Sequence, residues 1–242
     1  MAPERDMKIL MFFENDRESF LMDARVKKEA ASLAKAGHDV SILIYDMRID
    51  SEDVEFAGCR VRVVGLRHQP SSGEICGPRG RVLGLASNRG VSRLLAPILR
   101  LSEFLGFRRM VDGYRALPIA LSIEADVYHA HDYATLWLAA LCARLRGKPF
   151  VYDSHELWSD CWIRGRLQKI VIRTVERYLL PKASSVITVN ESIAVILAKR
   201  YGIGKPVVVA NFPIFRPLDA EDKARAGARI ARDLDRGRAR AA

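Results

Sequence analysis

Two short apolar segments of this chain end abruptly in histidines and carboxylates, the residue types best suited to acid–base and ligand chemistry. Residues 126–132 read Asp-Val-Tyr-His-Ala-His-Asp, and residues 151–156 read Val-Tyr-Asp-Ser-His-Glu. A buried parallel strand appears as an apolar run, and its carboxyl end opens into the crevice where α/β proteins bind ligands. Since one helix separates the two runs, both strand ends should reach the same rim. The side chains expected there are His131, Asp132, His155 and Glu156.

The ends of other predicted strands add polar groups to this edge. Asn15 and Asp16 follow the first apolar run, and Asn190 and Glu191 follow the sixth. Amides and carboxylates at this density match the hydroxyl groups of a polyol such as a sugar, and no glycine-rich phosphate cradle accompanies them. We therefore predict a substrate-binding set of seven residues: Asn15, Asp16, His131, Asp132, Glu156, Asn190 and Glu191.

Purely structural roles remain open for several polar side chains near the strand ends. His129 precedes the strand end and fits a buried, hydrogen-bonded core position, and His131 fits strand-end structure as well as ligand contact. Asp132 also fits the cap of the following helix, and Glu191 fits a helix N-terminus, where negative charge is favourable. For His155 we favour a functional role, because a histidine that faces a crevice packs poorly.

The motifs of several enzyme classes are absent from the sequence. No G-x-G-x-x-G follows the first strand, no phosphate-binding G-x-x-x-x-G-K occurs, and no G-x-S-x-G is present. These absences argue against a nucleotide-dependent oxidoreductase, a P-loop enzyme and an α/β hydrolase. A metal site is not predicted either, because His129 and His131 supply only two ligands and no further ligands are evident nearby.

Apolar runs alternate with amphipathic segments along the chain. The runs predicted as strands lie at residues 8–13, 38–45, 61–64, 149–154, 185–189 and 207–210, with a further one ending at residue 131. The predicted helices lie at residues 19–36, 91–105, 107–121, 135–145, 164–180 and 191–201. Strand–helix pairs at this spacing indicate an α/β fold with a doubly wound, mostly parallel, Rossmann-like sheet of about seven strands.

The predicted domain covers residues 1–215, and a tail follows it. Residues 216–242 are charged, rich in Ala and Arg and poor in large apolar groups, so we predict a frayed helix or a disordered segment. Within the domain, the helix at residues 91–105 has an apolar stripe opposite its arginines. That pattern favours either packing on the sheet or contact with an anionic membrane surface.

Composition restricts the compartment and the partners. The chain has 242 residues and a net charge of +10, which indicates an acidic partner or an arginine-rich solvated surface. Its four cysteines lack zinc or redox spacing and the N-terminus has no signal-peptide pattern, so we expect a cytoplasmic protein with reduced thiols. No run approaches the ~20 apolar residues that span a bilayer, so membrane contact should be peripheral, at the inner membrane face. No nucleic-acid partner is predicted.

The order of these motifs resembles the N-terminal domain of family 4 glycosyltransferases, which have the GT-B fold. The resemblance covers roughly residues 7–213. It rests on residues 7–10, Asp-Ala-Arg-Val at 23–26, Leu-Ala-Lys-Ala-Gly-His-Asp-Val at 33–40, His-Ala-His-Asp at 129–132, Tyr-Asp-Ser-His-Glu at 152–156 and Val-Ile-Thr-Val-Asn-Glu-Ser at 186–192. One feature departs from the pattern. Many members carry a Gly-Gly loop after the first strand, whereas residues 14–17 here are Glu-Asn-Asp-Arg.

The resemblance implies two Rossmann-like domains that face each other across a cleft, the N-terminal one binding mainly the acceptor. It implies that the C-terminal domain binds a nucleotide-sugar donor, and that transfer retains the anomeric configuration and usually needs no metal. It also implies that His155, the predicted catalytic residue, reaches the donor sugar near the reacting centre.

A donor-binding half is not found in this sequence, so the domain is expected to bind no cofactor alone. A nucleotide-sugar donor is expected only with a second domain. We expect a sugar or lipid-linked acceptor, and sugar transfer only with a donor-domain subunit supplied by another chain. The alternative is a truncated, catalytically inactive domain that binds a sugar or a protein partner.

Overall fold

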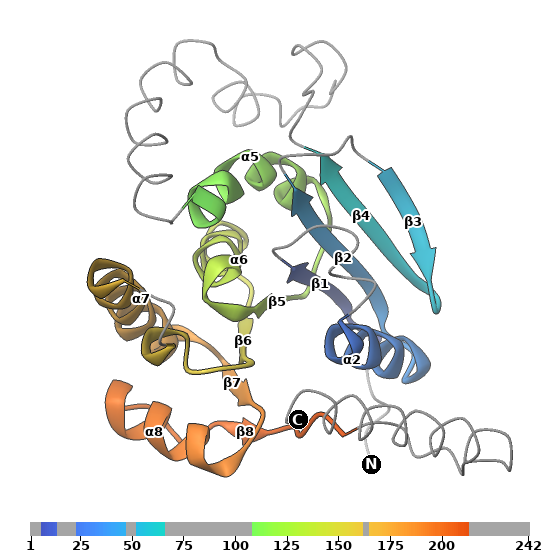
Figure 1. Cartoon of the computed structure of the whole chain (residues 1–242). Helices are drawn as coiled ribbons and strands as arrows, with labels where there is room; N and C mark the ends of the chain where they lie inside the picture. Colours follow the sequence, from blue (N-terminus) through green and yellow to red (C-terminus); the bar gives the residue numbers. More distant parts are fainter. Residues whose placement is uncertain (1–5, 14–22, 47–51, 66–107, 162–164, 213–242) are drawn as a thin grey trace, which may run out of the picture. The chain divides into compact units, whose positions relative to one another are not determined.

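The computed structural model of the chain describes residues 6–13, 23–46, 52–65, 108–161 and 165–212. The described helices and strands belong to one compact unit that ends at Ala210 (Figure 1). Some predictions lie outside the described residues and stay predictions: the helix at 91–105, the boundary at residue 215, the tail at 216–242, and the roles of Asn15 and Asp16.

Eight strands form one sheet in the order β3-β4-β2-β1-β5-β6-β7-β8. In chain order they are β1 (Lys8–Phe13), β2 (Asp39–Asp46), β3 (Glu52–Phe56), β4 (Cys59–Gly65), β5 (Val127–His131), β6 (Phe150–Ser154), β7 (Ser185–Thr188) and β8 (Val207–Val208). Every neighbouring pair is parallel except β3 with β4. The predicted mostly parallel, Rossmann-like α/β fold is therefore confirmed.

β3 is the strand that the sequence did not predict. It pairs antiparallel with β4, and the two residues between them, Ala57 and Gly58, have φ angles of 49° and 78°. A two-residue hairpin turn of this kind needs positive φ at both positions, and glycine accepts it without steric cost. The sequence of β3 is Glu-Asp-Val-Glu-Phe, so it lacks the apolar run by which the other strands were recognised.

The described helices flank the sheet on both faces. They are α2 (Ala24–Lys35), α5 (Arg108–Ser122), α6 (Asp132–Arg146), α7 (Arg166–Leu179) and α8 (Glu191–Tyr201), with short 3₁₀ turns at Trp158–Asp160 and Leu180–Lys182. α2 packs against β2 and β4, and α6 lies across the sheet on the side away from α2 (Figure 1). Gly147 and Gly202 end α6 and α8 in the left-handed conformation that glycine favours. No helix in the described part of the chain is long and apolar enough to cross a membrane.

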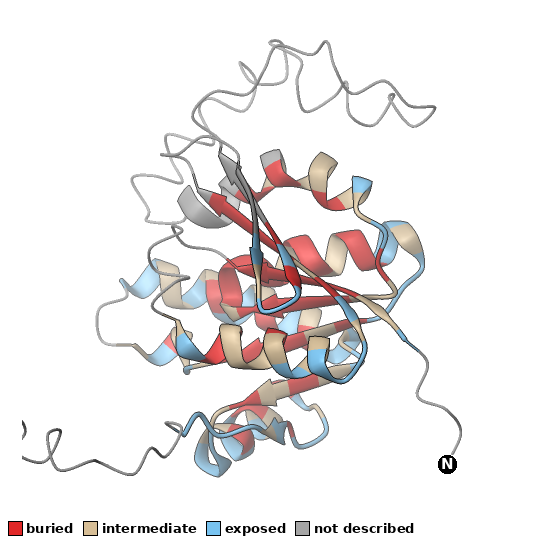
Figure 2. Ribbon diagram, turned by 90° about the vertical axis from the view of Figure 1, so that its right-hand side faces the viewer, coloured by how far each residue is buried: buried red, intermediate tan, exposed pale blue. Residues whose placement is uncertain are grey.

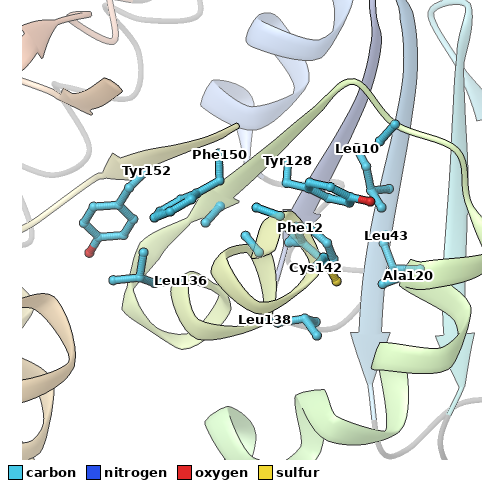
Figure 3. Packing of buried hydrophobic residues seen from close by; sticks show 14 of the residues in the cluster. Leu10, Phe12, Leu43, Ala120, Tyr128, Leu136, Leu138, Cys142, Phe150 and Tyr152 are labelled. Carbon is cyan, nitrogen blue, oxygen red and sulfur yellow. The ribbon is translucent and has the colours of Figure 1, made fainter. Parts of the chain in front are cut away.

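Alternate residues of β1 point to opposite faces of the sheet and join separate apolar clusters. Leu10 and Phe12 pack in the larger cluster with Leu136 of α6 (Figure 3). Met11 packs in the smaller cluster with Val26 of α2. All five side chains are fully buried, and the strands form the buried centre between the more exposed outer sides of the helices (Figure 2). Burying one such side chain contributes ~1.5–3 kcal/mol, so the core fixes the strand ends that carry the polar residues.

A buried carboxyl group on α7 joins three elements. Glu176 accepts a hydrogen bond from the hydroxyl of Tyr152 on β6 at 3.0 Å and another from Tyr201 on α8 at 2.5 Å. Burial raises the pKa of Glu176, and the two tyrosine hydrogen bonds offset part of that rise. The protonated carboxyl is therefore favoured more in the folded chain than in the unfolded one.

We expect Glu176→Gln to change the free energy of unfolding by less than ~1 kcal/mol near pH 4.5, because an amide keeps the hydrogen-bonding shape. Above that pH the folded wild-type protein binds more protons than the unfolded chain, so its stability falls as pH rises through the raised pKa. The amide does not titrate, so the variant should become relatively more stable at higher pH. Urea unfolding of both proteins between pH 4.5 and 8 measures the difference. A constant difference, or one that moves the other way, would contradict the raised pKa.

Candidate functional site

Polar side chains gather where β5 and β6 end, beneath one end of α2. His131 of β5 lies opposite Asp153 of β6 in the parallel register. Arg25 and Glu29 come from α2, where they are four residues apart and therefore lie on one side of the helix. Asp23 caps α2 by accepting hydrogen bonds from two backbone N–H groups of its first turn. This cap fixes where the helix begins and so where Arg25 lies.

Arg25 and Asp153 form a buried ion pair. The Nε and one terminal nitrogen of Arg25 donate to both carboxylate oxygens of Asp153, at distances from 2.7 to 3.1 Å. The other terminal nitrogen donates to the backbone carbonyl of Val209 at 2.9 Å. Burial would raise the pKa of Asp153, but His155, His131 and Arg25 hold that pKa well below its usual range. The pair therefore ties α2 to β6 and to the segment after β8.

His155 lies between two carboxylates just beyond the end of β6. Its Nδ1 is 3.4 Å from an oxygen of Asp132, and its Nε2 is 3.4 Å from an oxygen of Asp153. The same Nε2 is 3.3 Å from Nδ1 of His131. Asp132 is itself held, because it accepts hydrogen bonds from the backbone N–H of His155 at 3.1 Å and the indole of Trp158 at 2.5 Å. The imidazole is thus oriented from both sides.

The two neighbouring histidines carry different charges at neutral pH. Burial alone would lower the pKa of His155, but the hydrogen bond with Asp153 and the charge of Asp132 outweigh it and raise the pKa to about 9. For His131, burial and then His129 lower the pKa well below its ordinary value. The site therefore holds a cationic imidazole, with 14% of its side chain exposed, beside a neutral buried one. A fixed, charged N–H donor of this kind can stabilise negative charge on a bound substrate.

Beneath this pair, four buried polar atoms have no hydrogen-bond partner: both carboxylate oxygens of Glu29 and the Nε2 atoms of His129 and His131. One oxygen of Glu29 is 3.1 Å from Nε of Arg25, but without hydrogen-bond geometry. Burial and then the charge of Asp153 raise the pKa of Glu29 to about 8. Glu29, His129 and His131 form a group with Asp153. Within the part of the chain that the structure describes, the composition and spacing of this group suit a metal ion.

The structure brings together three of the predicted site residues, His131, Asp132 and His155. His131 is only 1% exposed, because α2 covers that face of the sheet, so its side chain lies beneath the rim instead of on it. Asp132 has a φ angle of 62° and begins α6, instead of capping it through its side chain. Non-glycine residues in this conformation are uncommon and cluster at functional sites.

The remaining predicted residues that the structure describes take part in local structure. Glu156 is exposed, and the thiol of Cys161 is 3.6 Å from its carboxylate. The side-chain oxygen of Asn190 accepts a hydrogen bond from the backbone of α8 at 2.9 Å, and Glu191 pairs with Lys205 at 2.6 Å. Their roles in substrate binding stay predictions.

Reasoning from the sequence missed Arg25 and Glu29 and gave Asp153 no functional role. The available signal was their spacing: both precede an apolar residue of the buried face of α2, Val26 and Ala30. Charged residues that recur beside a buried stripe point partly toward the core. The periodicity alone does not say which strand they reach.

Comparison with known proteins adds information on the family and the fold. A sequence profile described as a glycosyl transferase 4-like domain matches residues 22–211. The sucrose-phosphate synthase from Thermosynechococcus elongatus shares the fold with a TM-score of 0.55 at 14% identity, over 88% of this chain and 51% of that chain. No curated protein matches the chain. At this identity the structural likeness establishes the fold alone.

Two further solved structures are similar. The catalytic domain of starch synthase IV from Arabidopsis thaliana, bound to ADP and acarbose, matches with a TM-score of 0.49 at 14% identity, over 86% of this chain and 52% of that chain. The Anabaena protein HepE, in complex with UDP and glucose, matches with a TM-score of 0.47 at 16% identity, over 85% of this chain and 44% of that chain. The present chain spans about half the length of these proteins.

Proposed function

Because the chain belongs to the glycosyl transferase 4-like family, we propose that it is the acceptor-side half of a retaining sugar transferase. The family resemblance and the Rossmann-like fold expected from the sequence are both confirmed, by the profile match and by the fold shared with the sucrose-phosphate synthase. The acceptor, the donor and the stereochemistry go beyond these findings and are part of the proposal.

The observation that carries the proposal is the position of the His155 ring at the carboxyl ends of the strands, between Asp132 and Asp153, whose carboxylates raise its pKa. Transfer from a nucleotide sugar breaks a bond to phosphate, so negative charge develops on the leaving oxygen. A donor that is oriented before the reaction stabilises such charge without reorganisation at that moment. Asp132 and Asp153 supply this orientation for His155, one at each ring nitrogen.

The ring remains available to a substrate, although carboxylates flank it. Its contacts with Asp132 and Asp153 are each 3.4 Å. Strong charge-assisted hydrogen bonds are shorter, about 2.7–2.9 Å, so an oxygen of a bound sugar or phosphate can compete for the ring N–H groups. The partly exposed edge of His155 gives the approach.

The donor side of the reaction is proposed to come from another chain. Transferases of this kind exclude water between two domains, which strengthens the electrostatic interactions inside the cleft. The acceptor, a sugar or a lipid-linked sugar, is proposed to bind on the half described above, and the nucleotide sugar to bind on the partner. The expected peripheral contact with an anionic membrane also stays a prediction.

The purified chain is expected to release no nucleoside diphosphate from nucleotide sugars when it is alone. It should do so when a polypeptide carrying a donor-binding domain, encoded in the same genome, is co-purified with it. A coupled assay for the released nucleoside diphosphate and mass spectrometry of the acceptor measure this, with the donor polypeptide alone as the control. Robust turnover by the chain alone would contradict the proposal.

One observation favours the alternative of an inactive sugar- or partner-binding domain, namely that both ring nitrogens of His155 already face carboxylates. An inactive domain would give no turnover with any donor polypeptide, yet would still retain binding to a sugar or to a partner. Calorimetric titration of the chain with candidate acceptor sugars separates the two proposals when turnover is absent.

A further inference from the structure

Four potential metal ligands converge beneath the strand ends, from three different elements. One oxygen or nitrogen each from Glu29 of α2, His129 and His131 of β5, and Asp153 of β6 lies within 4.8 Å of every other. We propose that these four side chains bind a divalent transition-metal ion, with Zn²⁺ as the best match. This site goes beyond the proposed sugar transfer, which needs no metal.

The unpaired atoms are the first argument for this site. His129 and His131 are 7% and 1% exposed, and the Nε2 atom of each lacks a hydrogen-bond partner. Both carboxylate oxygens of Glu29 are buried without a hydrogen bond as well, although one of them lies 3.1 Å from Nε of Arg25. A buried polar group without a partner costs ~1–3 kcal/mol, so proteins rarely keep several in one place. A single cation held between these side chains would give the imidazoles and the carboxylate a common partner.

The composition of the cluster selects the kind of ion. Two imidazoles and two carboxylates are ligands that Zn²⁺ accepts in a tetrahedral arrangement, whereas Ca²⁺ and Mg²⁺ prefer oxygen ligands alone. Tetrahedral ligands at ~2.1 Å from Zn²⁺ lie ~3.4 Å apart, so the cluster must contract slightly on binding. For Glu29 this movement breaks no hydrogen bond, but it stretches the ion pair with Nε of Arg25 at 3.1 Å.

The charges around the cluster leave a place for a cation. Three carboxylates, those of Glu29, Asp132 and Asp153, face two cations, Arg25 and His155, so the carboxylates outnumber the cations by one. A metal ion takes the place of protons when it binds such ligands. The three hydrogen bonds from Arg25 to Asp153 do not exclude a metal, because a carboxylate offers about four lone-pair sites.

The surroundings of His131 resemble those of a metal-bound histidine. If Nε2 binds the ion, Nδ1–H is left with a carboxylate oxygen of Asp153 at 3.7 Å. Histidines that bind metals usually donate their second ring N–H to a neighbouring acceptor, which fixes the ring. A metal here would therefore link α2 to β5 and β6. It would also fix the ring of His131, which contacts His155.

The direct test is binding of Zn²⁺ to the full chain after metal is removed with EDTA and the chelator is dialysed away. Isothermal titration is expected to show one Zn²⁺ per chain. Titration with Co²⁺ should give visible absorption bands of a four-coordinate site with nitrogen and oxygen ligands. A cobalt–thiolate site would add strong near-ultraviolet absorption, so the spectrum distinguishes this cluster from the four cysteines of the chain.

Two ligand variants and one control locate the ion. Glu29→Gln and His131→Ala should each weaken Zn²⁺ binding by more than ~100-fold, beyond the 10–100-fold that losing an outer-shell partner costs. His38→Gln should leave binding unchanged, because His38 lies outside the cluster and contacts the backbone of Met7. In EDTA, Glu29→Gln should unfold at the wild-type temperature, which shows that weaker binding does not come from misfolding.

Three results would overturn the site. One is the absence of stoichiometric Zn²⁺ binding to the wild-type chain. The second is wild-type affinity in both Glu29→Gln and His131→Ala, which would place the ion elsewhere. The third is a cobalt spectrum with thiolate bands, which would assign binding to the cysteines.

Discussion

Replacing Asp153 by alanine is expected to lower the free energy of unfolding by about 3–5 kcal/mol. The guanidinium of Arg25, 5% exposed, would lose its three hydrogen bonds to a carboxylate and keep the carbonyl of Val209 and the contact with Glu29 at 3.1 Å. Breaking a buried ion pair by removing one partner costs about this much. For a domain of this size the loss corresponds to a drop of about 6–20 °C in the thermal midpoint. Urea unfolding in the presence of EDTA measures the effect without any contribution from bound metal.

An exposed pair with the same bonding pattern supplies the control. Arg60 donates to both carboxylate oxygens of Asp39 at 2.8 and 3.0 Å, but the two side chains are 73% and 46% exposed. Asp39→Ala should therefore cost less than ~1 kcal/mol. Adding Arg25→Met to Asp153→Ala should recover part of the loss, because it removes the unpaired charge. Equal losses for Asp153→Ala and Asp39→Ala would contradict the energetic role of the buried pair.

Local sequence patterns accounted for most of the sheet, and they failed where the structure depends on a turn. β1 is an apolar run with the bounds that its pattern predicts, because a strand buried on both faces excludes polar residues. β3 has three acidic residues and is held in place by its hairpin with β4. α6 begins three residues earlier than predicted, because Asp132 turns the chain directly from strand to helix at a φ angle of 62°.

Part of the site follows from the positions of the strand ends in the sequence. His131, Asp132 and His155 meet because the carboxyl ends of parallel strands lie at one edge, which is a rule that sequence order can apply. The contribution of α2 could not be found in this way. Arg25 and Asp153 are 128 residues apart, and their contact depends on which face of the sheet the helix covers. A metal site was not predicted because only ligands close together along the chain were counted. Glu29 and Asp153 approach the histidines only in the folded protein.

His155→Ala is expected to lower kcat about 10²-fold in the proposed complex of this chain with a donor-domain partner. The loss follows from removing one oriented donor that stabilises charge in the transition state, for which the typical cost is ~10²–10³-fold. KM for the nucleotide sugar should change less than kcat, because the interaction strengthens as the bond to phosphate breaks. Steady-state kinetics with saturating acceptor measure both constants.

Two further variants separate chemistry from structure. His155→Gln keeps a hydrogen-bonding side chain without the positive charge, so its kcat should also fall if the charge is what matters. His38→Ala should leave kcat unchanged, because His38 lies beside the amino end of β2, at the opposite edge of the parallel sheet. Both His155 variants must still co-purify with the donor polypeptide, which shows that the complex forms. If kcat is unchanged in His155→Ala under these conditions, the imidazole takes no part in transfer, and the proposed role of the strand-end rim in catalysis is wrong.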